Sequence, residues 1–182
     1  NGNSSTMTVR PTNNKVTNCT IANFALYGLY INGQNDLTIE YNDINRATRA
    51  TVTTFYGIYA VSRSPGLKIN GNRIHSPGGT AGTTAFTCYF IYGSSLTGSA
   101  TKPVNITNNA VYNVNNGTGL IYGLASFSGD TMNVMHNTLD FGTLACTGTS
   151  TIYGTYFSGT NMSMVNFRNN IKTWHGDTLP KP

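Results

Sequence analysis

The amino-acid sequence predicts an all-β solenoid of about five to six coils, and three observations support this prediction. Apolar and polar residues alternate in many short runs, which is typical of half-buried strands. A first frame, which reads apolar, two variable residues, Asn, one variable residue, apolar, recurs along the chain. A second frame, built around Tyr-Gly, recurs between its copies. A solenoid requires such repetition, because each coil places its side chains over those of the previous coil.

The first frame predicts a strand, a corner and a second strand in each coil. Its clearest copies are "LTIEYNDI" (37–44), "LKINGNRI" (67–74) and "VNITNNAV" (104–111). Asn adopts the left-handed backbone region readily, and amides stacked at the strand spacing of about 4.8 Å can bond to one another. We therefore expect the Asn column to turn the corners as a structural ladder, with a small buried thiol replacing Asn in the first coil. The column comprises Asn42, Asn72, Asn109, Asn137 and Asn170, with Cys19 in the first coil.

The second frame predicts another strand in each coil, with aromatic side chains on its outer face. Its copies are "YGLYI" (27–31), "YGIYA" (56–60), "TCYFI" (87–91), "YGLAS" (122–126) and "YGTYF" (153–157). If the third residue of each copy points inward, strand alternation points the fourth residue outward. The outward column then contains Tyr30, Tyr59, Phe90, Ala125 and Tyr156, whereas Tyr27, Tyr56, Tyr122 and Tyr153 are expected in the core.

The Asn column and the Tyr-Gly frames resemble the right-handed parallel β-helix repeats of the pectate-lyase-like superfamily, over roughly residues 14 to 172. The resemblance implies a right-handed parallel β-helix in which residues 1–182 form one domain, expected to be a segment of a larger secreted protein. That superfamily includes polysaccharide lyases and hydrolases, phage tailspikes, adhesins and surface proteins of unknown role. The fold therefore does not decide the function.

Composition limits the partners that we expect. Charged residues make up only 9% of the chain, and the net charge of +5 comes from scattered residues rather than from Lys/Arg runs. A nucleic-acid footprint normally needs a clustered basic patch, and a membrane helix needs an apolar run of about 20 residues. We therefore expect neither nucleic-acid binding nor membrane insertion. The expected partners are a polysaccharide or cell-surface glycan and flanking domains of the same protein, outside the cell or on its surface.

The ionisable residues do not predict a catalytic centre. No column of the repeat contains two of the six carboxylates, although Asp43 aligns with Arg73 as a surface ion pair between coils. His75, His136 and His175 fall in different columns, so no Ser–His–Asp group is expected. The sequence also lacks the ligand spacings of a metal site, and we expect no cofactor. Cys19, Cys88 and Cys146 allow either one disulfide and a free thiol or three thiols.

The leading hypothesis is a non-catalytic extracellular module, structural or adhesin-like, that binds glycans through the exposed aromatic column. Its candidate ligand-binding residues are Tyr30, Tyr59, Phe90, Tyr156, Arg46 and Arg49. The alternative is a polysaccharide lyase or glycoside hydrolase, whose active groups would be Arg46, Arg49, Arg63 and Arg73 with Asp36, Glu40 and Asp43. A further alternative is a segment of a trimeric tailspike-like fibre, with the aromatic column buried between subunits.

Overall fold

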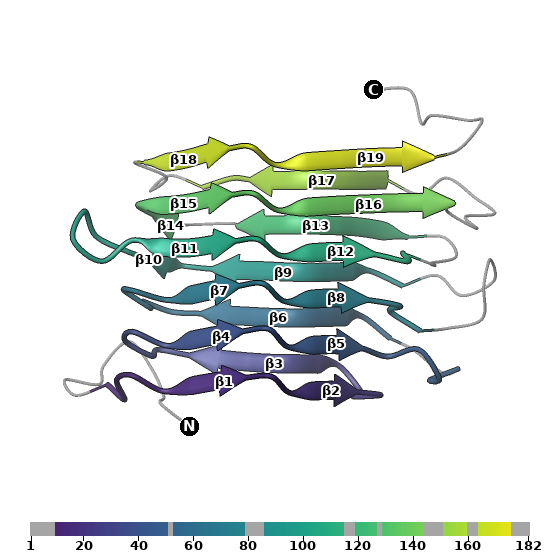
Figure 1. Cartoon of the computed structure of the whole chain (residues 1–182), viewed down its shortest axis with the longest axis horizontal. Helices are drawn as coiled ribbons and strands as arrows, with labels where there is room; N and C mark the ends of the chain where they lie inside the picture. Colours follow the sequence, from purple (N-terminus) through teal and green to yellow (C-terminus); the bar gives the residue numbers. More distant parts are fainter. Residues whose placement is uncertain are drawn as a thin grey trace.

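The computed structural model describes residues 10–50, 53–78, 86–114, 119–126, 129–143, 151–159 and 164–175. Over these ranges the regular structure consists of strands, which stack into a β-solenoid with three parallel sheets (Figure 1). Each coil contributes one strand to each sheet in turn. Six strands in two of the sheets and five in the third agree with the expected five to six coils.

The first two sheets contain the strands of the first frame. The first sheet comprises β1 (Lys15–Thr17), β4 (Thr38–Glu40), β7 (Lys68–Asn70), β11 (Val104–Thr107), β15 (Met132–Met135) and β18 (Val165–Arg168). The second sheet comprises β2 (Thr20–Ala22), β5 (Asp43–Asn45), β8 (Arg73–His75), β12 (Ala110–Tyr112), β16 (Thr138–Thr143) and β19 (Ile171–His175).

The third sheet contains the strands of the second frame. It comprises β3 (Tyr27–Asn32), β6 (Phe55–Val61), β9 (Cys88–Ser94), β13 (Leu120–Ser126) and β17 (Thr151–Phe157). Two further strands, β10 (Leu96–Thr97) and β14 (Gly129–Asp130), form a separate two-stranded parallel sheet.

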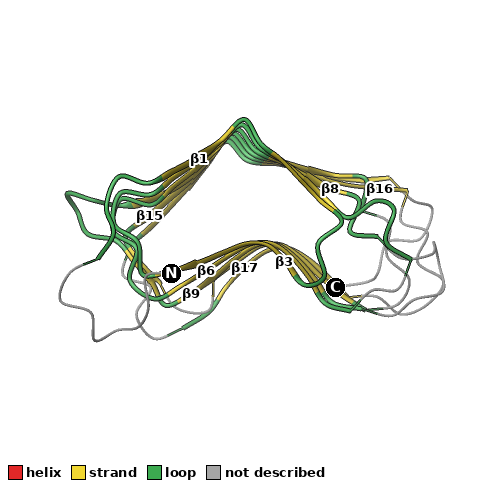
Figure 2. Cartoon of the chain, turned by 90° about the horizontal axis from the view of Figure 1, so that it is seen from below, coloured by secondary structure: helices red, strands yellow, loops and turns green. Residues whose placement is uncertain are grey.

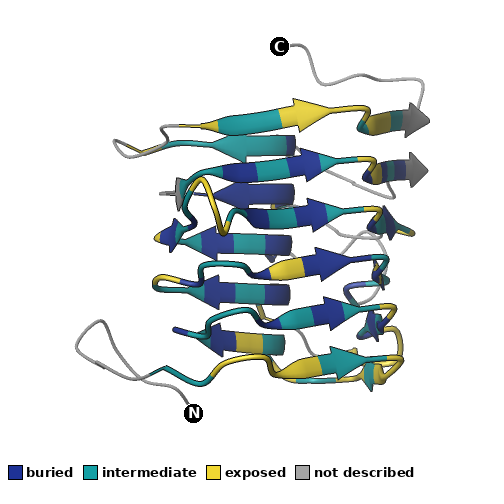
Figure 3. Cartoon of the chain, turned by 60° about the vertical axis from the view of Figure 1, so that its left-hand side comes forward, coloured by how far each residue is buried: buried dark blue, intermediate teal, exposed yellow. Residues whose placement is uncertain are grey.

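Equivalent residues of neighbouring coils pair in register and form apolar columns inside the stack. Ile39 pairs with Ile69 in the first sheet, and Ile44 pairs with Ile74 in the second, as the repeat predicted. These four side chains are at most 1% exposed, and burying each stabilises the fold by about 1.5–3 kcal/mol. The three sheets enclose this core (Figure 2), and burial is lower in the end strands of the stack (Figure 3).

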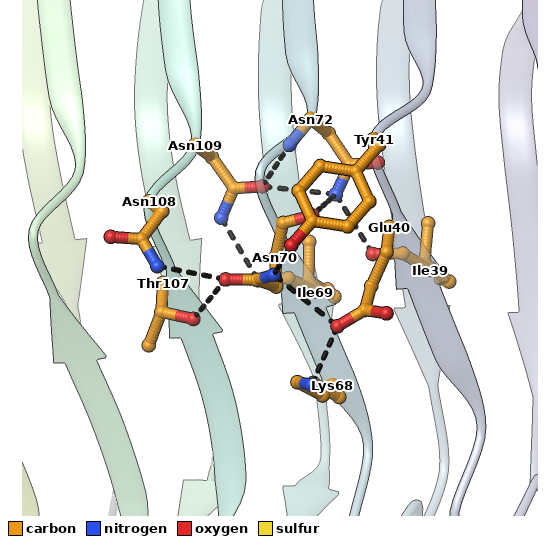
Figure 4. Close-up of polar contacts among 10 residues, drawn as sticks. All are labelled: Ile39, Glu40, Tyr41, Lys68, Ile69, Asn70, Asn72, Thr107, Asn108 and Asn109. Atoms are coloured by element: carbon orange, nitrogen blue, oxygen red, sulfur yellow. Dashed lines mark hydrogen bonds and ion pairs between the residues drawn. The ribbon is translucent and has the colours of Figure 1, made fainter. Parts of the chain in front are cut away.

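The corner between the first and second sheets is built by the Asn ladder, which the structure confirms (Figure 4). The side-chain Nδ2 of Asn72 donates to Oδ1 of Asn109 in the next coil at 3.0 Å and to the Ile39 carbonyl of the previous coil at 2.9 Å. Its Oδ1 accepts from the backbone N–H and Nδ2 of Asn42. The same bonds repeat along the column, so the buried amides satisfy backbone groups that each tight corner leaves unpaired.

Two details of the corner differ from the sequence prediction. The left-handed residue is the one before each ladder Asn, and this column comprises Asn18, Tyr41, Gly71, Asn108, His136 and Asn169. One residue thus makes the turn, which leaves the next free to point its amide inward. Cys19 is exposed rather than buried, although its backbone N–H still donates to Oδ1 of Asn42. The ladder therefore ends at Cys19 because a thiol cannot supply the amide groups that continue it.

Candidate functional site

The outer face of the third sheet carries two columns of tyrosines, which together we call the tyrosine face. It contains nine of the eleven tyrosines of the chain. The first column comprises Tyr27, Tyr56, Tyr89, Tyr122 and Tyr153, and the second comprises Tyr30, Tyr59, Tyr92 and Tyr156, with Ala125 in the fourth coil.

The structure places Tyr30, Tyr59 and Tyr156 in one outward column, as expected, but Phe90 is not in it. Phe90 is fully buried, and its ring packs against Phe55 at 5.2 Å between centroids. Tyr92 pairs with Tyr59 and takes the outward position. The sequence alignment was therefore wrong by two residues in this coil, because Phe90 replaces the glycine of the frame and the Tyr92-Gly93 pair of this coil lies three residues later.

The first column was expected in the core, which is wrong for Tyr27, Tyr56 and Tyr153, whereas Tyr122 is buried, at 8% exposed. In β6, Phe55, Ile58 and Ala60 are buried, whereas Tyr56 and Tyr59 are half-exposed, so simple alternation fails between the two tyrosines. Gly57 lies between them, where an added Cβ would come within 2.5 Å of the Phe90 carbonyl oxygen. The close approach of the backbones at Gly57 allows two consecutive residues, Gly57 and Ile58, to face inward. The tyrosines on either side of them therefore both face outward.

The tyrosine rings stack along the axis of the solenoid. Ring centroids in the first column are 4.9 Å apart for Tyr56–Tyr89 and 4.7 Å apart for Tyr89–Tyr122, with planes within 5° of parallel. The second column is more tilted, at 72° for Tyr30–Tyr59 and 36° for Tyr59–Tyr92. Because neighbouring rings cover each other, the interior of the face offers ring edges and hydroxyls rather than ring faces.

Burial, together with neighbouring phenols, disfavours ionisation of five tyrosines of the tyrosine face. Burial, assisted by the neighbouring phenols, raises the pKa of Tyr59 and of Tyr89 to about 12. Burial also raises the pKa of Tyr56, Tyr92 and Tyr122. These five hydroxyls therefore remain neutral groups that can both donate and accept hydrogen bonds.

We expect the folded chain to lose stability in alkaline solution. An unfolded phenol ionises near pH 10, whereas the folded chain holds these phenols neutral, so their contribution is complete below pH 10. It is lost as the pH rises from 10 towards 12. Urea unfolding at increasing pH, with the absorbance of phenolate at 295 nm, measures both effects. Ionisation of all tyrosines near pH 10 without loss of stability would contradict the packing of this face.

A polar group surrounds Asn70 at the end of β7, next to the corner between the first and second sheets (Figure 4). Glu40 receives the ammonium of Lys68 at 2.6 Å and Nδ2 of Asn70 at 3.2 Å. Oδ1 of Asn70 in turn accepts from Thr107 and Asn108, at 2.9 Å each. The group contains a single carboxylate, whereas glycoside hydrolysis requires two around the scissile bond.

The expected ion pair between Asp43 and Arg73 is confirmed at 2.8 Å. Asp43 also contacts Nε2 of His75 at 3.1 Å, and Nδ1 of His75 lies 3.0 Å from Oγ of Ser76. Burial opposes ionisation of Asp43, yet hydrogen bonds from Asn45 and His75, with the charges of His75 and Arg73, keep its pKa below the ordinary value.

A Ser–His–Asp chain is thus present where the sequence predicted none. The prediction failed because it compared residues within columns, whereas His75 reaches diagonally to Asp43 in the neighbouring coil. The backbone N–H of Ser76 donates to the Asn113 carbonyl and is not free to stabilise an oxyanion. This arrangement favours a surface network over a nucleophilic centre.

The Asp43–Arg73 pair should contribute little to stability. The Arg73 side chain is 64% exposed, and solvent screens such pairs. We expect Arg73→Ala to lower the free energy of unfolding by less than about 1 kcal/mol, with the difference shrinking in 1 M salt. Urea unfolding at low and high salt checks this; a larger loss that salt does not reduce would contradict it.

Arg46 and Arg49 do not form a shared surface site. Arg46 is fully buried, and its guanidinium donates to four carbonyls while packing near the rings of Phe55 and Phe86. The accepting carbonyls are those of Ala25, Thr53, Thr54 and Pro77, at 2.6–3.2 Å. Burial lowers the pKa of Arg46 to about 10. Arg46 therefore holds loops together and offers no group to a surface ligand, whereas Arg49 is exposed.

The three carboxylates of the alternative enzymatic hypothesis are held in separate ion pairs. Asp36 binds Lys102 at 2.6 Å, whereas Glu40 binds Lys68 and Asp43 binds Arg73. Arg63 is exposed, and its carbonyl accepts from Arg10. Among the described residues, no group of three or more His, Cys, Asp or Glu side chains could hold a metal ion. Within the same residues, no helix has the length and apolarity to cross a membrane.

No disulfide joins Cys19 to Cys88. Cys88 is buried in the third sheet and Cys19 is exposed at the first corner, whereas Cys146 lies outside the described residues.

Comparison with known proteins supports the architecture. Residues 1–139 match a family model described as "Right handed beta helix region". Searches of curated proteins and of solved structures find no significant match. The match spans the first four copies of the Asn frame and reaches the fifth, which ends at Leu139.

Proposed function

Because the chain belongs to the right-handed β-helix family, we propose that it is a non-catalytic extracellular module that binds a glycan along its tyrosine face. The observation that carries this proposal is the concentration of nine tyrosines on one outer face of a rigid stack. Amphipathic phenols gathered in this way are typical of binding surfaces, because each ring offers apolar area beside a hydroxyl.

The geometry of the face suggests how a glycan would be bound. Interior rings are covered by their neighbours, so the sugar would contact ring edges and exchange hydrogen bonds with the phenol hydroxyls. Tyr30, in the first coil, is 53% exposed and is the member of the face best placed to stack on a sugar ring. Repetition at the strand spacing would let one chain of sugars contact several coils.

The arrangement of charges supports binding without turnover. The carboxylates of Asp36, Glu40 and Asp43 are each neutralised by a different cation, which does not favour a pair acting together on one glycosidic bond. A surface rich in Asn and Thr and poor in charge is consistent with a position outside the cell or on its surface. Flanking domains of the same protein would then present the module to the glycan.

A glycan array, with product release assayed on every ligand that binds, tests the proposal. We expect binding without new reducing ends or unsaturated uronates. The Tyr30→Ala/Tyr59→Ala variant should bind at least tenfold more weakly, a loss of about 1.4 kcal/mol. Circular dichroism and thermal unfolding confirm that the variant is folded. Release of products would instead favour a lyase or hydrolase, and the absence of any ligand would leave a structural solenoid.

A further inference from the structure

The tyrosine face is a continuous chain of aromatic contacts across five coils. Tyr56 contacts Tyr27, Tyr59, Tyr89 and Tyr92, with centroids 4.9–5.8 Å apart. Tyr122 extends the chain from Tyr89 to Tyr153 and Tyr156, at 4.7–5.6 Å. Each member of the face therefore touches at least one other phenol of the face.

Exposure differs sharply along this chain of rings. Tyr30 is 53% exposed and Tyr27 is 37% exposed, whereas Tyr122 is 8% exposed. An oxidant in solution would thus reach the first coil most easily. A phenoxyl radical formed there can pass along the face, because each transfer needs only an electron and a proton to move between rings already in contact.

We propose that the tyrosine face is a site of oxidative cross-linking, in which peroxide and a haem peroxidase join tyrosines of adjacent coils. The pair Tyr59–Tyr92 is the best placed, since its centroids are 4.8 Å apart and its planes are inclined at 36°. The two rings of a linked biphenol are likewise adjacent and mutually twisted. This proposal does not depend on glycan binding.

Hydrogen peroxide is the oxidant that takes up the electrons and protons released when two phenols couple. Each of two phenols loses an electron and its hydroxyl proton and becomes a phenoxyl radical. The unpaired electrons form a carbon–carbon bond between ortho positions, and the hydrogen on each of those carbons moves to the phenolic oxygen through solvent. The peroxide accepts the two electrons and two protons and yields two molecules of water.

Tyr41 provides a matched control within the same chain. It is 60% exposed, more than any member of the face, but it lies at the corner between the first and second sheets, where its ring packs on Gly71. If exposure alone decided the outcome, Tyr41 would react first. If contact between phenols decides it, the products come from the face.

The test treats the full chain, at a concentration low enough to disfavour collisions, with hydrogen peroxide and a haem peroxidase. We expect dityrosine fluorescence, a monomer lighter by two hydrogen atoms for each bond, and joined peptides that link tyrosines of the face. Tyr41→Phe should leave the yield unchanged, whereas Tyr59→Phe/Tyr92→Phe, which retains the packing of the rings, should lower it at least twofold. Absence of dityrosine, links through Tyr41, or links only between chains would overturn the proposal.

Discussion

Asn72→Ala should lower the free energy of unfolding by about 3–5 kcal/mol, because the ladder amide has no substitute in the corner. Its Oδ1 accepts the backbone N–H of Asn42 at 3.0 Å, and its Nδ2 donates to the Ile39 carbonyl at 2.9 Å. Both backbone groups lie inside the stack. Each buried polar group left without a partner costs about 1–3 kcal/mol, and a small cavity adds to this.

The matched control for Asn72 is Asn133, which also belongs to a column of stacked amides. Its Nδ2 donates to Oδ1 of Asn105 at 2.9 Å, but it lies on the outer face of the first sheet, where water can replace the bond. We expect Asn133→Ala to cost less than about 1 kcal/mol. Urea unfolding of both variants measures the difference, and equal losses would show that the ladder is not what holds the corner.

Arg46→Met should lower the free energy of unfolding by about 3–5 kcal/mol, although Met retains much of the apolar volume. The substitution leaves the carbonyls of Ala25, Thr53, Thr54 and Pro77 without their donor. Arg46→Lys should recover only part of the loss, because a compact ammonium cannot span the carbonyls that the planar guanidinium reaches.

Arg49 is the matched control for Arg46, since it lies three residues away but is exposed. We expect Arg49→Met to change the free energy of unfolding by less than about 0.5 kcal/mol. Thermal and urea unfolding of the three variants compare these effects. If Arg46→Met were as stable as Arg49→Met, the four carbonyls would have found other partners and Arg46 would not be a structural element.

The repeat predicted the fold and the Asn ladder because stacking fixes both. Inward residues such as Ile39, Ile69 and Ile106 must recur at equivalent positions when each coil lies on the last. The same logic placed Asp43 beside Arg73 correctly. Such columns depend only on the order of residues along the chain, so one sequence is enough to find them.

The candidate site was predicted less completely, and the errors have specific causes. The predicted register of β9 was wrong because Phe90 occupies the position that glycine holds in the other coils, and the Tyr92-Gly93 pair of β9 lies three residues later. The two consecutive inward positions at Gly57 and Ile58 break strict alternation, so the period alone could not assign Tyr56 to the outer face. A recurring Tyr-Gly-x-Tyr spacing was the available signal, because strict alternation would place tyrosines three residues apart on opposite faces of the sheet.

Arg46 and His75 were beyond prediction for a different reason. The role of Arg46 depends on carbonyls from three separate loops, and that of His75 on a diagonal contact with Asp43. Neither depends on a repeated column. Sequence repetition reveals the contacts that recur in every coil, whereas each of these contacts occurs at one place in the stack.

Titration calorimetry with a glycan that the chain binds tests the central claim most directly. The wild-type chain is compared with Tyr59→Ala/Tyr92→Ala, on the tyrosine face, and with Lys68→Ala/Asn105→Ala, a neighbouring-coil pair on the outer face of the first sheet. We predict that only the tyrosine variant loses affinity, at least tenfold, while both remain folded. Equal affinity in the tyrosine variant, or a comparable loss in the first-sheet variant, would contradict the assignment of glycan binding to the tyrosine face.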